Sequence, residues 1–413
     1  MLDSRGAGQE TRKEETVMRR TIGAFFKTSV LVVFVVSSLM VSKGNPLFAA
    51  EPIKVGVVLC VTGWAGALGT LTKEAITIEA EEVNRKGGVL GRQIDLYIED
   101  DQSNPTNAAV AATKLIRDKN VPIVIGSTLT VFCMPMIPIF EREQVPNISL
   151  GAGHEITVPL KKWVFRIPLT DYRLSPIMLD FTVNTLGARK VALLHSTDAS
   201  GTMGANGIMD TIDKYHASIV ITEKFDPKDT NMIPQLMKIK AANPDAIILY
   251  TSATPAAVVA KNYQQLGMTT SVVASHGVPT PEFVKLAGKI VEEGRWIIYG
   301  MKPLYAEQLT PDDPYRKNLY DPFKKALQEK YGKTDVTSFH ANGHDAMRIV
   351  VEALKIAGRD DRAALRDALE KVKYKGLLNA EWIYSSTDHD GQSGDGVEPL
   401  IIRKDGKWWP YKK

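Results

Sequence analysis

The amino-acid sequence predicts an α/β protein of two lobes, each built on a doubly wound, mostly parallel sheet flanked by helices. Apolar strands and amphipathic helices alternate along most of the chain, a pattern typical of parallel strands joined by crossover helices. The alternation begins near residue 53 and begins again near residue 190. About 360 residues follow the first 50, and a chain of that length exceeds a single hydrophobic core.

Residues 1–50 are predicted to be an N-terminal extension and a cleaved signal peptide. Arg19 and Arg20 precede residues 28–42, an uncharged and mostly apolar run of 15 residues, and the small residues Ala49 and Ala50 follow it. Basic residues, a short apolar core and small residues together form a secretory signal. The run is shorter than the ~20 residues of a membrane span. We therefore expect an exported protein, with the translation start and the cleavage site left open.

The charge balance gives no support to a nucleic-acid partner. The chain has 51 Lys and Arg against 47 Asp and Glu, and removing residues 1–50 leaves 44 against 43. A near-neutral chain with no stripe of basic and aromatic residues is not typical of nucleic-acid binding. Cys60 and Cys133 both follow strands of the first lobe. A disulfide and two free buried thiols are both compatible with an oxidising compartment.

The first lobe is expected to open with an apolar strand at residues 53–60, which turns into a helix through a glycine-rich segment. Leu71, Ala75 and Ile78 recur at three- and four-residue spacing along that helix and mark its packed face. Residues 93–98 alternate as a second strand, and another helix follows. This order predicts parallel pairing of the strands.

Two successive turns of the first lobe are the candidate ligand-binding segments. A β-branched strand at residues 121–125 and a short strand at residues 147–149 each end in a turn with hydroxyls or bare backbone N–H groups. Such turns, lying beside helix N-termini, favour an anion, most simply a small carboxylate. The alternative is that the glycines only make tight turns. The residues of the two turns are Ser127, Thr128 and Thr130, and Gly151, Ala152 and Gly153.

The second lobe and the C-terminal region complete the predicted organisation. Strands are expected at residues 190–195, 218–225, 245–250 and 272–275, with helices between them, and long helices at residues 314–331, 338–357 and 361–372. Strands at residues 381–384 and 398–403 and a hairpin turn at 404–407 close the chain. These long helices need a sheet to pack on. If they pack on the sheet of the first lobe, the chain crosses between the two lobes several times, and the crossings form a hinge. We therefore expect residues 51–170 with 300–380 in lobe one, and 171–299 with 381–413 in lobe two.

Several segments resemble the type I periplasmic binding proteins of the branched-chain amino acid (leucine/isoleucine/valine-binding) group. They are IKVGVVLCVTGWAGALG, EEVNRKGGVLGRQIDLYIEDDQSNP, VIGSTLT with VPNISLGAGHEIT, WVFRIPLTDY, LGARKVALLHSTDASG and HANGHDAMRIVVEAL. The resemblance covers essentially the whole chain after the signal peptide. It implies two lobes that close over a small carboxylate-bearing solute, either a branched-chain amino acid or a related organic or aromatic acid.

The same resemblance implies a role in transport and the partners that this role requires. The chain is expected to be a monomeric substrate-binding component that delivers its ligand to an inner-membrane ABC permease with a cytoplasmic ATPase. It is expected to need no cofactor and to be no enzyme. The alternative is a periplasmic ligand-sensing subunit of a signalling receptor.

The resemblance also carries over individual site residues, with two departures. The turn at Ser127, Thr128 and Thr130 and the turn at residues 151–153 correspond to the segments that hold the ligand's carboxylate. Ser200 stands where the family has a tyrosine, and His276 stands where it has the glutamate that meets the ligand's ammonium group. An imidazole has no fixed negative charge, so we expect an acid without an α-ammonium. Further candidates, each with a packing or loop-capping alternative, are Trp64, His154 and Tyr250.

Other motifs predict neither catalysis nor a metal site. The segment that begins at Gly63 partly matches the dinucleotide-binding fingerprint, but Ala65 stands at the position where the fingerprint requires its second glycine. His340 and His344 have zinc-compatible spacing but no third ligand is evident. Residues 388–395 resemble a calcium loop in composition only. No nucleophile and base are arranged for catalysis.

Overall fold

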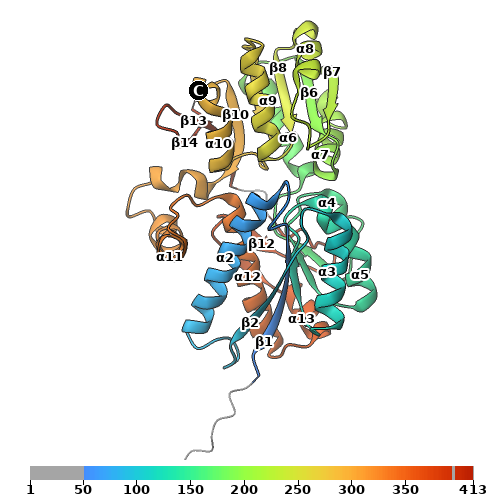
Figure 1. Ribbon diagram of the computed structural model, residues 1–413, viewed down its shortest axis with the longest axis vertical. Helices are drawn as coiled ribbons and strands as arrows, with labels where there is room; N and C mark the ends of the chain where they lie inside the picture. Colours follow the sequence, from blue (N-terminus) through green and yellow to red (C-terminus); the bar gives the residue numbers. More distant parts are fainter. Residues whose placement is uncertain (1–50, 393–395, 413) are drawn as a thin grey trace, which may run out of the picture. The chain divides into compact units, whose positions relative to one another are not determined.

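The computed structural model describes residues 51–392 and 396–412 of the chain. The predicted signal peptide and N-terminal extension lie outside the described residues. The described part forms two open sheets with helices on both faces and one two-stranded ribbon, which confirms the predicted α/β class (Figure 1). The helices are α2 (Gly66–Arg85), α3 (Pro105–Arg117), α4 (Thr130–Cys133), α5 (Ile137–Glu143), α6 (Asp171–Asp180), α7 (Ala199–Met209), α8 (Ile233–Ala242), α9 (Ala253–Gln265), α10 (Pro281–Ala287), α11 (Asp321–Tyr331), α12 (Ser338–Ala357) and α13 (Arg362–Leu369).

The first sheet has the strand order β2-β1-β3-β4-β5, and every pair in it is parallel. Side chains of β1 alternate between two cores: Val57 packs with α2, α12 and α13, while Val58 packs with α3, α4 and α5. Gly126 ends β3 with φ +122°, and a Cβ there would lie 1.9 Å from the Val58 carbonyl oxygen. Only glycine allows this approach. The strands are β1 (Ile53–Leu59), β2 (Ile94–Asp100), β3 (Val124–Gly126), β4 (Asn147–Ser149) and β5 (Val164–Arg166).

The second sheet has the order β14-β13-β10-β9-β8-β6-β7. Pairs from β6 to β10 are parallel, whereas β13 and β14 are antiparallel, joined by the hairpin that the sequence predicts at residues 404–407. Leu194 of β6 packs with α8, α9 and α10, and Leu193 packs with α6 and α7 on the other face. The strands are β6 (Lys190–Ser196), β7 (Ser218–Phe225), β8 (Ala246–Tyr250), β9 (Ser271–Ala274), β10 (Trp296–Met301), β13 (Val397–Ile402) and β14 (Trp408–Pro410).

The long C-terminal helices return to the first sheet, as the sequence predicts. In Figure 1 α12 lies along α2, and a Cβ at Gly343 would lie 2.5 Å from the carbonyl oxygen of Thr72. The two helix backbones therefore touch at a glycine. The helix predicted from residue 314 begins only at Asp321, because Arg316–Tyr320 forms a π-helical turn first.

The ribbon of β11 (Lys373–Lys375) and β12 (Glu381–Ile383) packs with the first sheet. Trp382 of β12 is fully buried in the core of that sheet, and its indole N–H donates to the Ile167 carbonyl at 3.1 Å. Its chain segment was expected in the second lobe from the sequence pattern. We propose instead that residues 381–392 belong to the first lobe.

Two further features bear on the expectations from the sequence. Cys60 and Cys133 are buried free thiols, and burial raises the pKa of Cys60 to about 12 and that of Cys133 to about 11. Across residues 51–392 and 396–412, we find no helix with both the length and the apolar character that a membrane crossing requires.

The histidines considered as zinc ligands contact carboxylates instead. His340 Nε2 lies 3.4 Å from Glu74, and His344 lies 3.0 Å from Glu79 and 2.7 Å from Asp345. Within the described residues no group of three or more His, Cys, Asp and Glu side chains could hold a metal ion.

We predict that His344→Gln lowers the stability of the protein below neutral pH. Burial opposes the charge, but the hydrogen bonds to Asp345 and Glu79 outweigh it and raise the pKa of His344 to about 9. The imidazolium therefore stabilises the folded state fully below its ordinary pKa of 6.5, and this contribution disappears as the pH rises to about 9. The expected loss at pH 6 is about 3 kcal/mol, measured by urea unfolding. An equal loss at pH 6 and pH 9.5 would contradict the charge assignment; exposed His216→Asn serves as the control.

Candidate ligand-binding cleft

A cleft of about 770 Å³, part of it open to solvent, lies at the carboxyl ends of strands from both sheets. Open parallel sheets bind ligands at this edge. Residues after β3, β4 and β5 line it from the first sheet, residues after β6, β8 and β9 from the second, and the start of α12 closes it. The polar members are Thr128, Thr130, Asp171, Asp198, Ser200, Thr251, Ser252, Ser275, His276, Ser338, Asn342 and Gln392.

The two candidate turns of the first lobe are in direct contact. Thr130 Oγ1 accepts a hydrogen bond from the backbone N–H of Gly153 at 2.9 Å. A Cβ at Gly153 would lie 2.3 Å from Thr130 Cγ2, so the close approach requires glycine. Thr128, Thr130 and Ala152 line the cleft. Ser127 is buried, and its hydroxyl donates to Asp101 at 2.6 Å, which holds the turn together from behind.

Four hydroxyls of the cleft wall are buried and make no hydrogen bond to any described residue. They belong to Thr128, Thr251, Ser252 and Ser338. Ser252 and Ser338 stand at the N-terminal ends of α9 and α12, where backbone N–H groups are also directed outward. Buried polar groups are ordinarily hydrogen-bonded, and leaving them unpaired costs free energy. The wall therefore has unused hydrogen-bonding capacity among the described residues.

His276 and Ser200 line the cleft on the side of the second sheet. Burial lowers the pKa of His276 to about 4, although its contact with the Leu169 backbone opposes this, so the ring is neutral at physiological pH. Its Nδ1 makes no hydrogen bond to the described residues. The Ser200 hydroxyl donates to Asp171 Oδ2 at 2.6 Å. These two residues thus offer hydrogen-bonding groups to the cleft without a fixed charge of their own.

The remaining predicted site residues lie beside the cleft rather than in its lining. Trp64 packs against Phe132, with ring centroids 5.9 Å apart. His154 stacks on Tyr172 at 4.9 Å, and the Tyr250 hydroxyl donates to the Asp171 carbonyl at 3.0 Å. Gly151 and Gly153 are buried at the turn that bears Ala152. Their positions support the cleft wall.

Several residues of the lining are not among the site residues predicted from the sequence. Thr251 and Ser252 directly follow a predicted buried strand, so their position could have suggested them. Asp171, at the start of α6, looks in sequence like an ordinary helix-start residue. Gln392 comes from a loop far along the chain, and both polar atoms of its buried amide make no hydrogen bond to the described residues.

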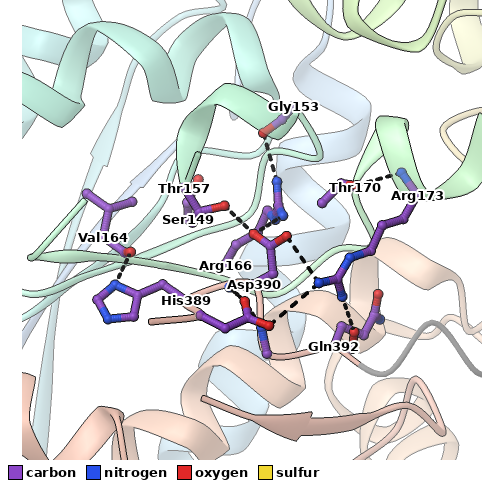
Figure 2. A network of polar contacts seen from close by, with 12 residues as sticks. Ser149, Gly153, Thr157, Val164, Arg166, Thr170, Arg173, His389, Asp390 and Gln392 are labelled. Atoms are coloured by element: carbon purple, nitrogen blue, oxygen red, sulfur yellow. Dashed lines mark hydrogen bonds and ion pairs between the residues drawn. The ribbon is translucent and has the colours of Figure 1, made fainter. Parts of the chain in front are cut away.

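A buried ionic network supports the cleft wall from behind (Figure 2). Arg166, at the end of β5, is fully buried, pairs with Asp390 and donates to the Gly153 carbonyl at 2.8 Å. Arg173 of α6 donates to the Gln392 carbonyl at 2.7 Å and lies 3.7 Å from Asp390. The network therefore links β5, α6 and the loop of residues 385–392 to Gly153 and Gln392, two residues at the cleft.

Two mostly parallel sheets, with a polar cleft at the carboxyl ends of strands from both, define a two-lobed ligand-binding protein. The profile of the family described as "Periplasmic binding protein" matches residues 52–394, and the chain belongs to this family. Its relatives are substrate-binding proteins and not enzymes, and the chain is likewise a binding protein.

Named relatives and solved structures agree with this assignment. The chain is 25% identical over 322 residues to the leucine-, isoleucine-, valine-, threonine- and alanine-binding protein of Pseudomonas aeruginosa, covering 78% of this chain and 83% of that protein. A crystal structure of an extracellular ligand-binding receptor from Rhodopseudomonas palustris HaA2 matches with a TM-score of 0.80 and 28% identity, covering 87% of this chain and 99% of that one. The LivJ substrate-binding protein of Streptococcus pneumoniae in complex with isoleucine shares the fold, with a TM-score of 0.70 and 21% identity over 85% and 99% of the chains.

Proposed function

We propose that this chain is the exported substrate-binding component of an ABC importer and captures a small carboxylate-bearing solute between two closing lobes. The observation that carries the proposal is the set of four buried, unpaired hydroxyls on the cleft wall, at strand ends and helix N-termini. Hydroxyls and helix-start N–H groups suit a carboxylate. Support for the solute class comes from the P. aeruginosa relative, which is named for binding amino acids.

Closure follows from where the lining residues come from. The cleft is lined from both sheets, so a ligand gains its full set of contacts only when the two halves approach one another. Its binding free energy therefore shifts the population towards the closed state. We propose that this monomeric closed form is what an inner-membrane permease with its ATPase recognises, in the periplasm, after removal of the signal peptide.

The first experiment is a thermal-shift screen of the mature protein, residues 51–413, against two compound panels. One panel contains branched-chain and other amino acids, and the other contains aromatic, keto and short-chain carboxylates. A ligand that binds only the folded state raises the melting temperature by mass action. Stabilisation by members of either panel supports capture of a carboxylate. No stabilisation by any member, checked by calorimetry, would overturn the proposal.

We predict that Thr130→Ala and His276→Ala each weaken binding of the best compound at least tenfold, roughly the loss of one to two hydrogen bonds. Thr130→Ala removes the acceptor that holds Gly153 N–H, and His276→Ala removes a ring from the cleft wall. Calorimetry gives the dissociation constant, and circular dichroism verifies folding. Thr106→Ala and His216→Asn, at exposed positions outside the lining, are the matched controls. Unchanged affinity in both cleft variants would contradict the assignment of the site.

A further inference from the structure

We propose that Gln392, together with Asn342, binds an uncharged polar group of the ligand, so that the solute carries a hydroxyl or a carboxamide in addition to its carboxylate. Both residues line the cleft. The inference rests on the proposed capture of a carboxylate-bearing solute and deepens it by naming a second group that the ligand presents. Gln392 is then a residue that determines the specificity of the cleft.

The side chain of Gln392 is buried in the cleft wall without a hydrogen-bond partner. Only 3% of the residue is exposed. Its amide oxygen Oε1 and its amide nitrogen Nε2 are both buried, and neither makes a hydrogen bond to any described residue. A buried amide that forms no hydrogen bond costs free energy in the ligand-free protein. The amide thus presents to the cleft a buried donor and a buried acceptor, both without a partner among the described residues.

The backbone of Gln392 is held in place, so the amide is presented from a defined position. Its N–H donates to the Asp390 carbonyl at 2.7 Å, and its carbonyl accepts from Arg173 at 2.7 Å (Figure 2). Gln392 also forms an isolated β-bridge with Trp382 of β12. These contacts use only the backbone of Gln392, and so they remain when its side chain is exchanged.

A second carboxamide comes from the start of α12. Asn342 lies one helical turn after Ser338, on the same face of the helix, and both residues line the cleft. Asn342 is partly buried. No Lys or Arg is among the described residues of the lining. The two carboxamides therefore offer hydrogen bonds in a lining that has no basic side chain among the described residues.

The chemistry of an amide selects the kind of group that it binds. An ammonium group only donates and would leave Nε2 of Gln392 unpaired, whereas a carboxylate only accepts and would leave Oε1 unpaired. A hydroxyl or a carboxamide both donates and accepts, and so it satisfies both atoms.

A wholly apolar ligand body would not satisfy them. The rest of the lining includes the apolar side chains of Leu150, Leu169, Met301, Phe339 and Leu378. An apolar body would suit these side chains but would leave the buried amide of Gln392 unpaired. A site with such a polar group discriminates strongly against the analogue that lacks the matching hydroxyl or N–H.

The test uses pairs of carboxylates of similar shape, in which a polar group of one member takes the place of an apolar group of the other. Threonine is compared with valine, asparagine with leucine, and 4-hydroxyphenylacetate with 4-methylphenylacetate, by calorimetry on the mature protein. The third pair has no ammonium group, so its result does not depend on how the cleft receives an amine. We expect at least one polar member to bind, and at least tenfold more tightly than its counterpart, because the counterpart leaves a buried amide unpaired.

Two variants assign this preference to the two residues. Gln392→Met keeps the approximate length of the side chain and removes its amide, and Asn342→Leu does the same at a similar shape. In each variant the preference for the polar member should fall about tenfold. Gln392→Met should not lower the melting temperature of the ligand-free protein, because no described residue pairs with its amide. A lowered melting temperature with an unchanged preference would assign Gln392 to the fold and overturn the proposal.

Gln264→Met is the matched control, because it makes the same exchange at an exposed position of α9 outside the lining. It should change neither the affinities nor the preference, and circular dichroism of all variants verifies folding. Binding confined to compounds without a hydroxyl or carboxamide, or equal binding within the pairs, would overturn the inference while leaving carboxylate capture intact. An unchanged preference in both cleft variants would overturn it in the same way. Absence of binding by all six compounds and by the wider carboxylate panel would overturn the proposed function itself, and this inference with it.

Discussion

Asp390→Asn is expected to lower the free energy of unfolding by about 3–5 kcal/mol, the usual result of breaking a buried ion pair. Arg166 is fully buried, and its pKa, lowered by burial to about 10, keeps it charged at neutral pH. Asp390 is the carboxylate within ion-pair distance of it among the described residues. Removing that charge leaves a guanidinium in the core with only the Gly153 carbonyl as a partner for Nη1.

Asp388→Asn is the control two residues away. The Asp388 carboxylate is 47% exposed and lies 3.6 Å from Arg173, so its charge contributes little. Asparagine keeps the acceptor for the Asp390 backbone N–H, at 2.8 Å in the native loop. We expect a loss under about 1 kcal/mol, as for other exposed pairs. Urea unfolding of the three proteins at pH 7 measures both values, and losses of similar size in the two variants would contradict the buried network.

The sequence was sufficient for the fold because its signals were local. Buried β-branched strands, helix faces and glycine turns each depend on neighbouring residues, and so the alternation of strands and helices could be predicted along both lobes. Local patterns are weaker support for the assignment of a chain segment to one lobe or the other. Whether Trp382 belongs to the first or second lobe depends on a core formed by distant segments, and a period of three or four residues cannot show that.

The candidate cleft was predictable only where its residues follow a strand directly. Thr128, Thr130 and Ala152 stand in turns after strands, and the structure brings them into one lining. Ser338 and Gln392 reach the same lining from segments more than 180 residues further along. Nothing local marks such residues, because their role arises from tertiary packing. The absence of Lys and Arg from the described lining of the cleft is likewise a property of the assembled cleft.

Asp171→Asn is expected to stabilise the ligand-free protein above neutral pH. The pKa of Asp171 is raised from 3.8 to about 7, mainly by burial; Asp198 also raises it, and Arg166 and the Ser200 and Tyr250 hydroxyls lower it. Between about pH 4 and pH 7 the folded state thus binds a proton that the unfolded chain has released. Stability therefore falls as the pH rises through this window, and the loss is complete above it.

The amide has no proton to release, so the variant escapes this loss. At pH 8 we expect a gain of up to about 4 kcal/mol over wild type, shrinking towards zero at pH 4. Urea unfolding across this range measures it, with Asp180→Asn expected to show no such trend because that side chain is exposed. A gain that does not depend on pH would mean that the buried charge is not its source.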